Sequence, residues 1–173
     1  MADRSSPFIW KFWNSVAVAL GVLVAQPIVE FVVFTTLGNN LESDGAIGQE
    51  FDMIVLPGGE PGATNLGRDE RVTGLLQQMA QAGKYTAAIC AAPRVLAQSG
   101  LLEGRHATSY PGALEPDSVP GLKVVDTPVV IDGRVITSRG PGTAMDFALQ
   151  LIDVLVGKQK RAEVEAGLQR ITR

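Results

Sequence analysis

The sequence contains one cysteine, one histidine and nearly balanced charge. A single cysteine excludes an internal disulfide framework and fits a reducing compartment, so we expect the cytoplasm. A single histidine excludes a polyhistidine metal site, and one thiolate cannot form a cluster, so we expect neither a metal ion nor another cofactor. Fifteen lysines and arginines against eighteen acidic residues give a net charge of −3, which lacks the basic footprint of a nucleic-acid-binding protein.

The 173 residues suffice for one ordinary domain, which commonly has about 100–200 residues. Apolar residues make up 46% of the chain and charged residues 19%, a composition that excludes intrinsic disorder. From residue 52 onward, short apolar runs alternate with amphipathic helical patterns, which is typical of an α/β domain. The pattern predicts strands at 53–56, 85–89 and 106–110, a hairpin of strands 129–131 and 135–137, and helices at 71–82, 93–100, 143–156 and 158–170.

Residues 1–50 form a divergent apolar segment ahead of the domain expected at 51–173. The uncharged run 12–29 reaches the lower length limit of a membrane-spanning helix, and Trp10 and Trp13 lie at one end of it. The run is therefore a possible membrane anchor or signal peptide. Alternatively, residues 16–24 form the first strand and 28–37 a core element of the same domain. We favour the core interpretation, because a cleaved signal would leave the sheet without an obvious first strand.

Cys90 lies in the sequence Ala-Ala-Ile-Cys-Ala-Ala-Pro at 87–93, between an expected strand and an expected helix. A nucleophile at such a turn stands clear of the sheet, and the dipole and free amides of the helix N-terminus lower the pKa of a thiol. A lone buried cysteine is more often an inert small hydrophobic residue. The strand–cysteine–helix context favours the nucleophile.

A second motif, Leu-Pro-Gly-Gly-Glu-Pro-Gly at 56–62, follows the strand expected at 53–56. Glycines at the carboxyl end of a strand allow backbone amides to approach a reacting carbonyl or a developing oxyanion. Pro-Gly-Gly alone indicates only a turn. Its significance comes from the cysteine motif.

Three separated motifs occur in order: Asp-Met-Ile-Val-Leu-Pro-Gly-Gly at 52–59, the cysteine motif at 87–93, and Thr-Ser-Arg-Gly-Pro-Gly-Thr-Ala-Met-Asp-Phe-Ala at 137–148. Together they resemble the ThiJ/PfpI superfamily over residues 51–166, and within it the parkinsonism-associated deglycase and its bacterial chaperone-like relatives. The resemblance implies a flavodoxin-like three-layer α/β sandwich of the class I glutamine amidotransferase type, usually assembled as a homodimer. The active site would lie at the carboxyl ends of the strands.

The resemblance also assigns roles to individual positions. The family's nucleophile matches Cys90, and its oxyanion amides match those of Gly59 and Ala91. The residue before a proline after the third strand, often histidine in the family, is Tyr110 here. His106 cannot replace that imidazole, because four residues at about 3.3 Å each place it roughly 13 Å away along the strand.

The family normally holds its thiolate with a protonated glutamate from a turn after the first strand. No Glu-Glu-x-Glu cluster precedes Asp52, and Glu30 is the acid nearest that position. Aligning residues 16–25 with the first strand instead places Val32 beside the cysteine. We therefore expect a divergent or truncated N-terminal portion and a cysteine that is less activated than in typical relatives.

The resemblance implies a cysteine-dependent glyoxalase or deglycase of the stress response. Cys90 would attack a small aldehyde such as methylglyoxal, or a glycated adduct, without a cofactor. An alternative is a non-enzymatic redox-sensing or chaperone-like protein that uses oxidation of Cys90. A third hypothesis is a catalytically inactive domain tethered to a membrane.

Overall fold

A five-stranded sheet forms the centre of the computed structural model, which describes residues 31–33, 36–37, 40–41 and 51–169. Its strand order is β1 (Phe31–Val33), β4 (Met53–Leu56), β5 (Tyr85–Ile89), β9 (Val135–Ser138) and β8 (Val129–Asp132). The first four strands are parallel, and β8 pairs antiparallel with β9 as the predicted hairpin. The short strands β2 (Thr36–Leu37) and β3 (Asn40–Leu41) form a separate antiparallel pair.

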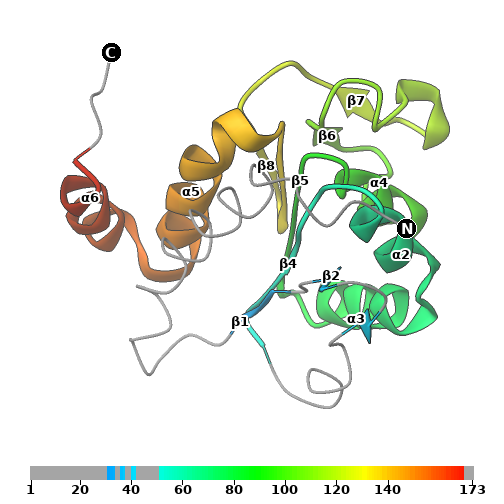
Figure 1. Ribbon diagram of the computed structural model, residues 1–173, viewed down its shortest axis with the longest axis horizontal. Coiled ribbons are helices and arrows are strands. Elements are labelled where there is room, and N and C mark those ends of the chain that lie inside the picture. The colour runs from blue at the N-terminus through cyan, green and yellow to red at the C-terminus, as the bar shows by residue number, and fades with distance from the viewer. Residues whose placement is uncertain (1–30, 34–35, 38–39, 42–50, 170–173) are drawn as a thin grey trace.

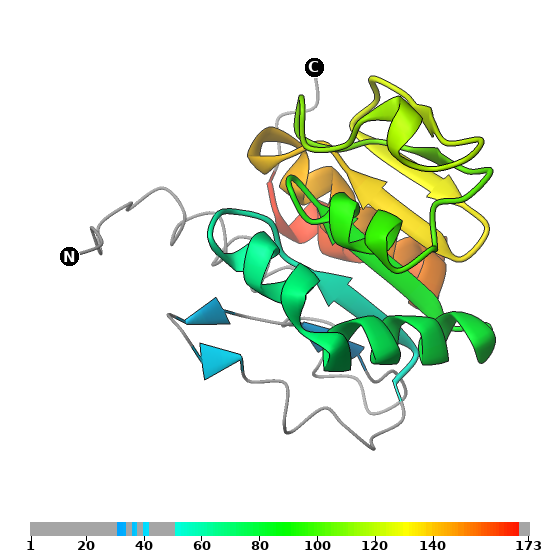
Figure 2. The same cartoon turned by 90° about the vertical axis from the view of Figure 1, so that its right-hand side faces the viewer.

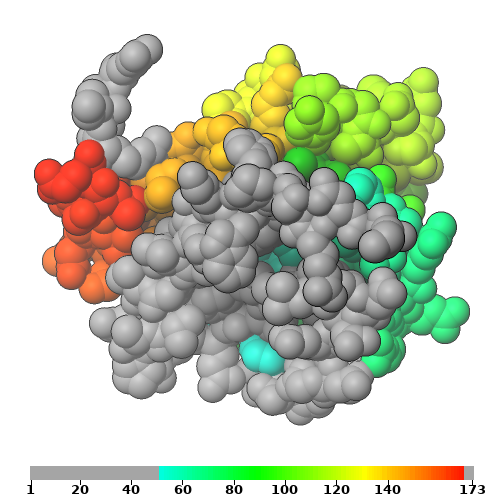
Figure 3. All heavy atoms as spheres, viewed as in Figure 1, coloured from blue at the N-terminus to red at the C-terminus, as the bar shows by residue number. Residues whose placement is uncertain are grey.

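Helices cover both faces of this sheet (Figures 1 and 2). One face carries α2 (Gly62–Arg68), α3 (Glu70–Gln81) and α4 (Pro93–Gln98); the other carries α5 (Ala144–Val156), on which α6 (Lys158–Gly167) packs. The helix α6 and the short strands β6 (His106–Ala107) and β7 (Lys123–Val124) lie at opposite ends of the long axis (Figures 1 and 3). This is the three-layer α/β sandwich that the sequence predicts.

Alternation along β4 explains why the sheet is covered on both faces. Ile54 and Leu56 pack with α2, α3 and α4, whereas Met53 and Val55 pack with Phe147 of α5. All four residues of β4 are buried, as expected of a central parallel strand. Because alternate residues of this continuous apolar run face opposite sides, helices pack on both faces of the sheet.

The strand expected at 106–110 is shorter than predicted and lies outside the main sheet. The strand β6 contains only His106 and Ala107, and it pairs in parallel with β7 outside the main sheet. The pairing stops because the Thr108 N–H donates to the side-chain oxygen of Thr137 at 2.9 Å rather than to a strand carbonyl. Two residues later, the Tyr110 N–H donates to the Cys90 carbonyl at 2.8 Å.

The helix α2 is an element that the sequence pattern does not predict. Gly62 and Gly67 lower its intrinsic helix propensity. Tertiary packing compensates, because Ala63 and Leu66 are fully buried and α2 contacts α4.

Of the first fifty residues, only the short strands β1, β2 and β3 can be compared with the sequence-based expectations. The strand expected at 16–24, the uncharged run 12–29 and Glu30 lie outside the described residues. In β1, Val32 lies in register with Ile54, which in turn pairs with Thr86 of β5. Val32 is thus level with Thr86, four residues before Cys90, and the alignment that places it beside Cys90 is wrong. Among the described helices, none combines the length and the apolar character that a membrane crossing requires.

Candidate active site

Cys90 occupies the sharp turn between β5 and α4. Its φ of 65° lies in the left-handed region, which residues with a side chain rarely adopt. The Cys90 N–H donates to the Ser138 carbonyl at 2.9 Å, and the Cys90 carbonyl accepts from the Tyr110 N–H at 2.8 Å. Two segments distant in the sequence therefore hold the strained conformation, and the predicted turn between strand and helix at Cys90 is confirmed.

The loop after β4 lies directly against this turn. A Cβ atom built on Gly58 would lie 2.5 Å from the Cβ of Cys90 and 2.6 Å from the carbonyl oxygen of Ile89, so only glycine fits. The next residue, Gly59, has a φ of 85°. Its backbone N–H and that of Ala91 both donate to the Cys90 sulfur. The expected proximity of Cys90 and the Gly59 amide is confirmed.

Burial raises the pKa of the Cys90 thiol above its ordinary value. The hydrogen bonds from Ala91 and Gly59 act in the opposite direction, and the negative charge of Glu60 adds to the rise. The amides therefore lower this pKa as expected, but burial outweighs them and the net shift is upward. The partly buried sulfur loses more hydration than the two amides replace.

A polar network next to the thiol is absent from the sequence-based predictions. The Glu60 carboxylate accepts a hydrogen bond from Thr64 Oγ1 at 2.7 Å and forms an ion pair with the Arg94 guanidinium. Arg94 also donates to Thr64 Oγ1 at 2.6 Å. Burial raises the pKa of Glu60, but the hydrogen bond from Thr64 and the charge of Arg94 prevail and hold it below its usual value. The sequence shows both charges near the site: Glu60 lies inside the motif at 56–62, and Arg94 directly follows the cysteine motif at 87–93.

Arg94 also lines a pocket of about 210 Å³. The pocket lies between α4 and the loop that runs through residues 113–119, and its other lining residues are Ala97, Gln98, Ala113, Leu114, Glu115, Ser118 and Val119. Cys90 does not belong to this lining.

The motif at 137–148 supports the cysteine turn from β9. Ser138 Oγ donates to the Pro128 carbonyl at 2.9 Å and shares a 2.7 Å hydrogen bond with Thr143 Oγ1. Thr143 Oγ1 also accepts from the Gly140 N–H at 3.1 Å. These contacts fix the backbone that accepts the Cys90 N–H. The resemblance identified this motif, but it did not predict the role of Ser138.

Tyr110 lies at the rim of the same turn. It is 53% exposed, and a Cβ built on Gly140 would lie 3.5 Å from its ring atom Cδ2, so the ring approaches the 137–148 motif. The structure thus brings Tyr110 together with the three other expected site residues in the described chain, Cys90, Gly59 and Ala91.

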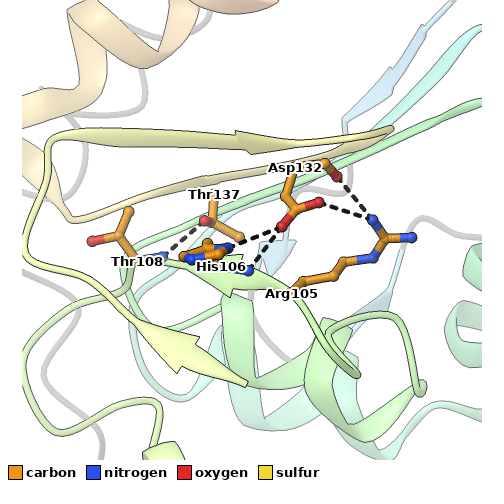
Figure 4. A network of polar contacts seen from close by, with 5 residues as sticks. All are labelled: Arg105, His106, Thr108, Asp132 and Thr137. Atoms are coloured by element: carbon orange, nitrogen blue, oxygen red, sulfur yellow. Dashed lines mark hydrogen bonds and ion pairs between the residues drawn. The ribbon is translucent and has the colours of Figure 1, made fainter. Parts of the chain in front are cut away.

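His106 lies elsewhere, at the turn of the β8–β9 hairpin (Figure 4). Its side chain is 52% exposed, and its Nδ1 lies 3.5 Å from Asp132 Oδ2. The backbone N–H of His106 donates to the same oxygen at 2.9 Å, and Arg105 bonds the other carboxylate oxygen at 3.2 Å. His106 is therefore an exposed strand histidine that pairs with Asp132. In the described ranges, no group of three or more histidine, cysteine or acidic side chains could hold a metal ion.

Comparisons with known proteins agree with this geometry. The sequence profile of the DJ-1/PfpI family matches residues 20–154. Protein dj-1beta of Drosophila melanogaster is 47% identical over 120 residues, covering 69% of this chain and 64% of that protein. A glutathione-independent glyoxalase of Caenorhabditis elegans is 40% identical, covering 64% of this chain and 58% of the relative. A deglycase of Pyrococcus abyssi is 37% identical, covering 61% and 63%.

The matched regions therefore span less than two thirds of each of these three relatives. The structural match is longer: the crystal structure of Drosophila melanogaster DJ-1beta superposes with a TM-score of 0.77 and 33% identity. That superposition covers 99% of this chain and 96% of the other. The profile match, these similarities and the supported cysteine turn lead to one conclusion: the chain belongs to the DJ-1/PfpI family.

Proposed function

We propose that this protein is a cysteine-dependent glyoxalase or deglycase of the stress response, acting on methylglyoxal or on the glycated adducts that it forms. The observation that carries the proposal is the Cys90 sulfur, held on a strained turn with the Gly59 and Ala91 amides donating to it. The proposal is also supported by the similarity of this chain to a glyoxalase and to a deglycase.

The reaction would begin with attack of the Cys90 thiolate on the aldehyde carbon, which forms a hemithioacetal. The former carbonyl oxygen then carries negative charge, and the amides of Gly59 and Ala91 are suited to stabilise it. In methylglyoxal, transfer of hydrogen from the aldehyde carbon to the ketone carbon yields a thioester, which water hydrolyses. The sum is methylglyoxal plus water giving lactate, so no external oxidant or reductant is needed.

Tyr110 would bound the substrate space in place of the family's usual imidazole. Its exposure and its contact with Gly140 support this role. Glu30 is the candidate for the protonated acid that supports the Cys90 thiolate. We expect Glu30→Ala to leave the pKa of Cys90 unchanged, whereas a rise in that pKa would identify Glu30 as this acid.

A second candidate function is redox sensing, with or without a chaperone-like activity. It is favoured by the same two amides, because they could also hydrogen-bond the oxygens of a sulfinate on Cys90. For a redox sensor, mass spectrometry of the peroxide-treated protein would show stable addition of two oxygens to Cys90. An assay of the untreated protein would show no turnover of aldehyde.

The proposal includes a homodimer in a reducing, cytoplasmic compartment. The lone partly buried thiol is compatible with that compartment. Sedimentation equilibrium would decide the oligomeric state.

The direct test is methylglyoxal consumption and lactate formation by the wild type, Cys90→Ser and His106→Ala. We expect Cys90→Ser to retain less than about a hundredth of the wild-type rate, because a serine hydroxyl is far less acidic than a thiol and a much weaker nucleophile at neutral pH. His106→Ala should retain nearly all of it, since His106 pairs with Asp132 at the hairpin turn. Equal losses in both variants would contradict the assignment.

A further inference from the structure

The network of Glu60, Thr64 and Arg94 fixes a negative charge near the Cys90 thiol, in the loop that lies against the cysteine turn. Glu60 directly follows Gly59, whose amide donates to the sulfur. Thr64 and Arg94 hold the Glu60 carboxylate, and their combined effect keeps its pKa below the usual value, so it is ionised at neutral pH. A charged group with partners on both α2 and α4 cannot easily swing away from the site.

The two charges of the ion pair do not cancel at the sulfur. Glu60 is close enough for its charge to raise the pKa of Cys90, whereas Arg94 exerts no comparable opposing effect on that thiol. The Glu60 side chain is 49% exposed and that of Arg94 is 30% exposed, so solvent weakens the field but does not remove it. An approaching electrophile therefore meets net negative potential from this pair.

We propose that Glu60, positioned by Arg94 and Thr64, makes Cys90 selective for uncharged electrophiles and excludes those that carry a carboxylate. The repulsive charge works as a specificity element, because it penalises the wrong substrate more than it helps the right one. This inference rests on the proposed function only in naming the substrate class. Glyoxal would be accepted, and glyoxylate, in which a carboxylate replaces one aldehyde group, would be rejected.

The test compares two alkylating reagents that differ in charge. Iodoacetamide is neutral and iodoacetate is an anion, and both react with the same thiolate. The ratio of their rates therefore cancels the thiolate fraction and reports only the local potential. Each ratio is divided by that of a small neutral thiol measured under the same conditions.

Glu60→Gln should raise the iodoacetate-to-iodoacetamide ratio about three- to tenfold at low ionic strength, as expected for one charge near a partly exposed site. Arg94→Gln should change it less than Glu60→Gln does, because Arg94 exerts no effect on the Cys90 thiol comparable to that of Glu60. Glu103→Gln, which removes an exposed carboxylate from the loop before β6, should leave it unchanged. In 1 M salt, the wild type and Glu60→Gln should converge.

A ratio that is equal in the wild type and Glu60→Gln at low salt would overturn the inference. So would an equal rise in Glu103→Gln, or a difference that persists in 1 M salt, because that would indicate a steric effect. If Glu60→Gln fails to fold, the salt dependence of the wild-type ratio still decides, because that ratio should rise toward the value of the small thiol in 1 M salt. Absence of methylglyoxal turnover with the predicted ratios intact would reject the proposed function and leave this inference standing.

Discussion

Gly58 shows how a single missing side chain allows the site to form. The loop after β4 reaches the cysteine turn only because no Cβ separates the two backbones. The motif identified this glycine as part of a turn, but its contact with Cys90 depends on the register of β4 beside β5, which a sequence pattern does not contain.

Gly58→Ala should lower the free energy of unfolding by about 1–3 kcal/mol, the usual cost of overpacking. Two of the atoms that its Cβ would meet, the Ile89 oxygen and the Ala91 nitrogen, belong to the backbone and cannot rotate away. Urea unfolding gives the stability, and the iodoacetamide rate reports the loss of the Gly59 amide from the sulfur. Gly142→Ala is the control, because no heavy atom lies within 4 Å of its Cβ position. Similar losses of unfolding free energy in Gly58→Ala and Gly142→Ala would contradict the close approach of Gly58 to the cysteine turn.

Some of the residues near the thiol could be predicted from the sequence, and others could not. Cys90, Gly59 and Ala91 follow from motifs whose chemistry is local. Glu60 and Arg94 do not, because their pairing depends on the register of β4 beside β5, which brings the loop after β4 to the first turn of α4.

At the scale of elements, apolar periodicity predicted the strands and helices that bury one continuous face. It predicted α3 and α5 because their buried residues recur at helical spacing. It missed α2, whose glycine-containing sequence is helical only through tertiary packing, and it overextended β6, whose pairing is ended by a side-chain oxygen of Thr137.

The helix α3 offers a test of an element boundary. The Asp69 carboxylate caps it by accepting from the Arg71 N–H at 2.9 Å. Hydrogen bonding by the Arg71 side chain, which outweighs burial, holds the pKa of Asp69 below its usual 3.8. Stability from this cap is therefore complete above the unfolded pKa and is lost as the pH falls through the lower folded value.

Asp69→Ala should cost about 1 kcal/mol of unfolding free energy at pH 7, and the difference should narrow below about pH 3 as the wild-type carboxyl is protonated. Urea denaturation at both pH values measures this. Asp69→Asn keeps an acceptor at the same position and should lose less at pH 7. A loss in Asp69→Ala that is the same at both pH values would show that the charge of the cap contributes nothing.

At the scale of the whole molecule, the site is a meeting point of three chain segments. The loop after β4, the turn after β5 and the loop after β9 all follow parallel neighbouring strands, so their carboxyl ends lie at one edge of the sheet. This convergence could be predicted from the order of the motifs. The balance between burial and hydrogen bonding at the sulfur could not, because it depends on how closely those loops pack.

In the proposed function, Cys90 is the reacting group and its burial limits its reactivity. The most direct measurement is the pH dependence, between about pH 6 and pH 9, of the iodoacetamide alkylation rate and of kcat/KM for methylglyoxal on the same wild-type protein. Because the pKa of Cys90 is raised, thiolate forms only as the pH increases, and both rates should rise together, close to tenfold per pH unit below that pKa. An alkylation rate that is already constant from pH 6 to pH 8, or turnover that survives complete alkylation of Cys90, would contradict the account.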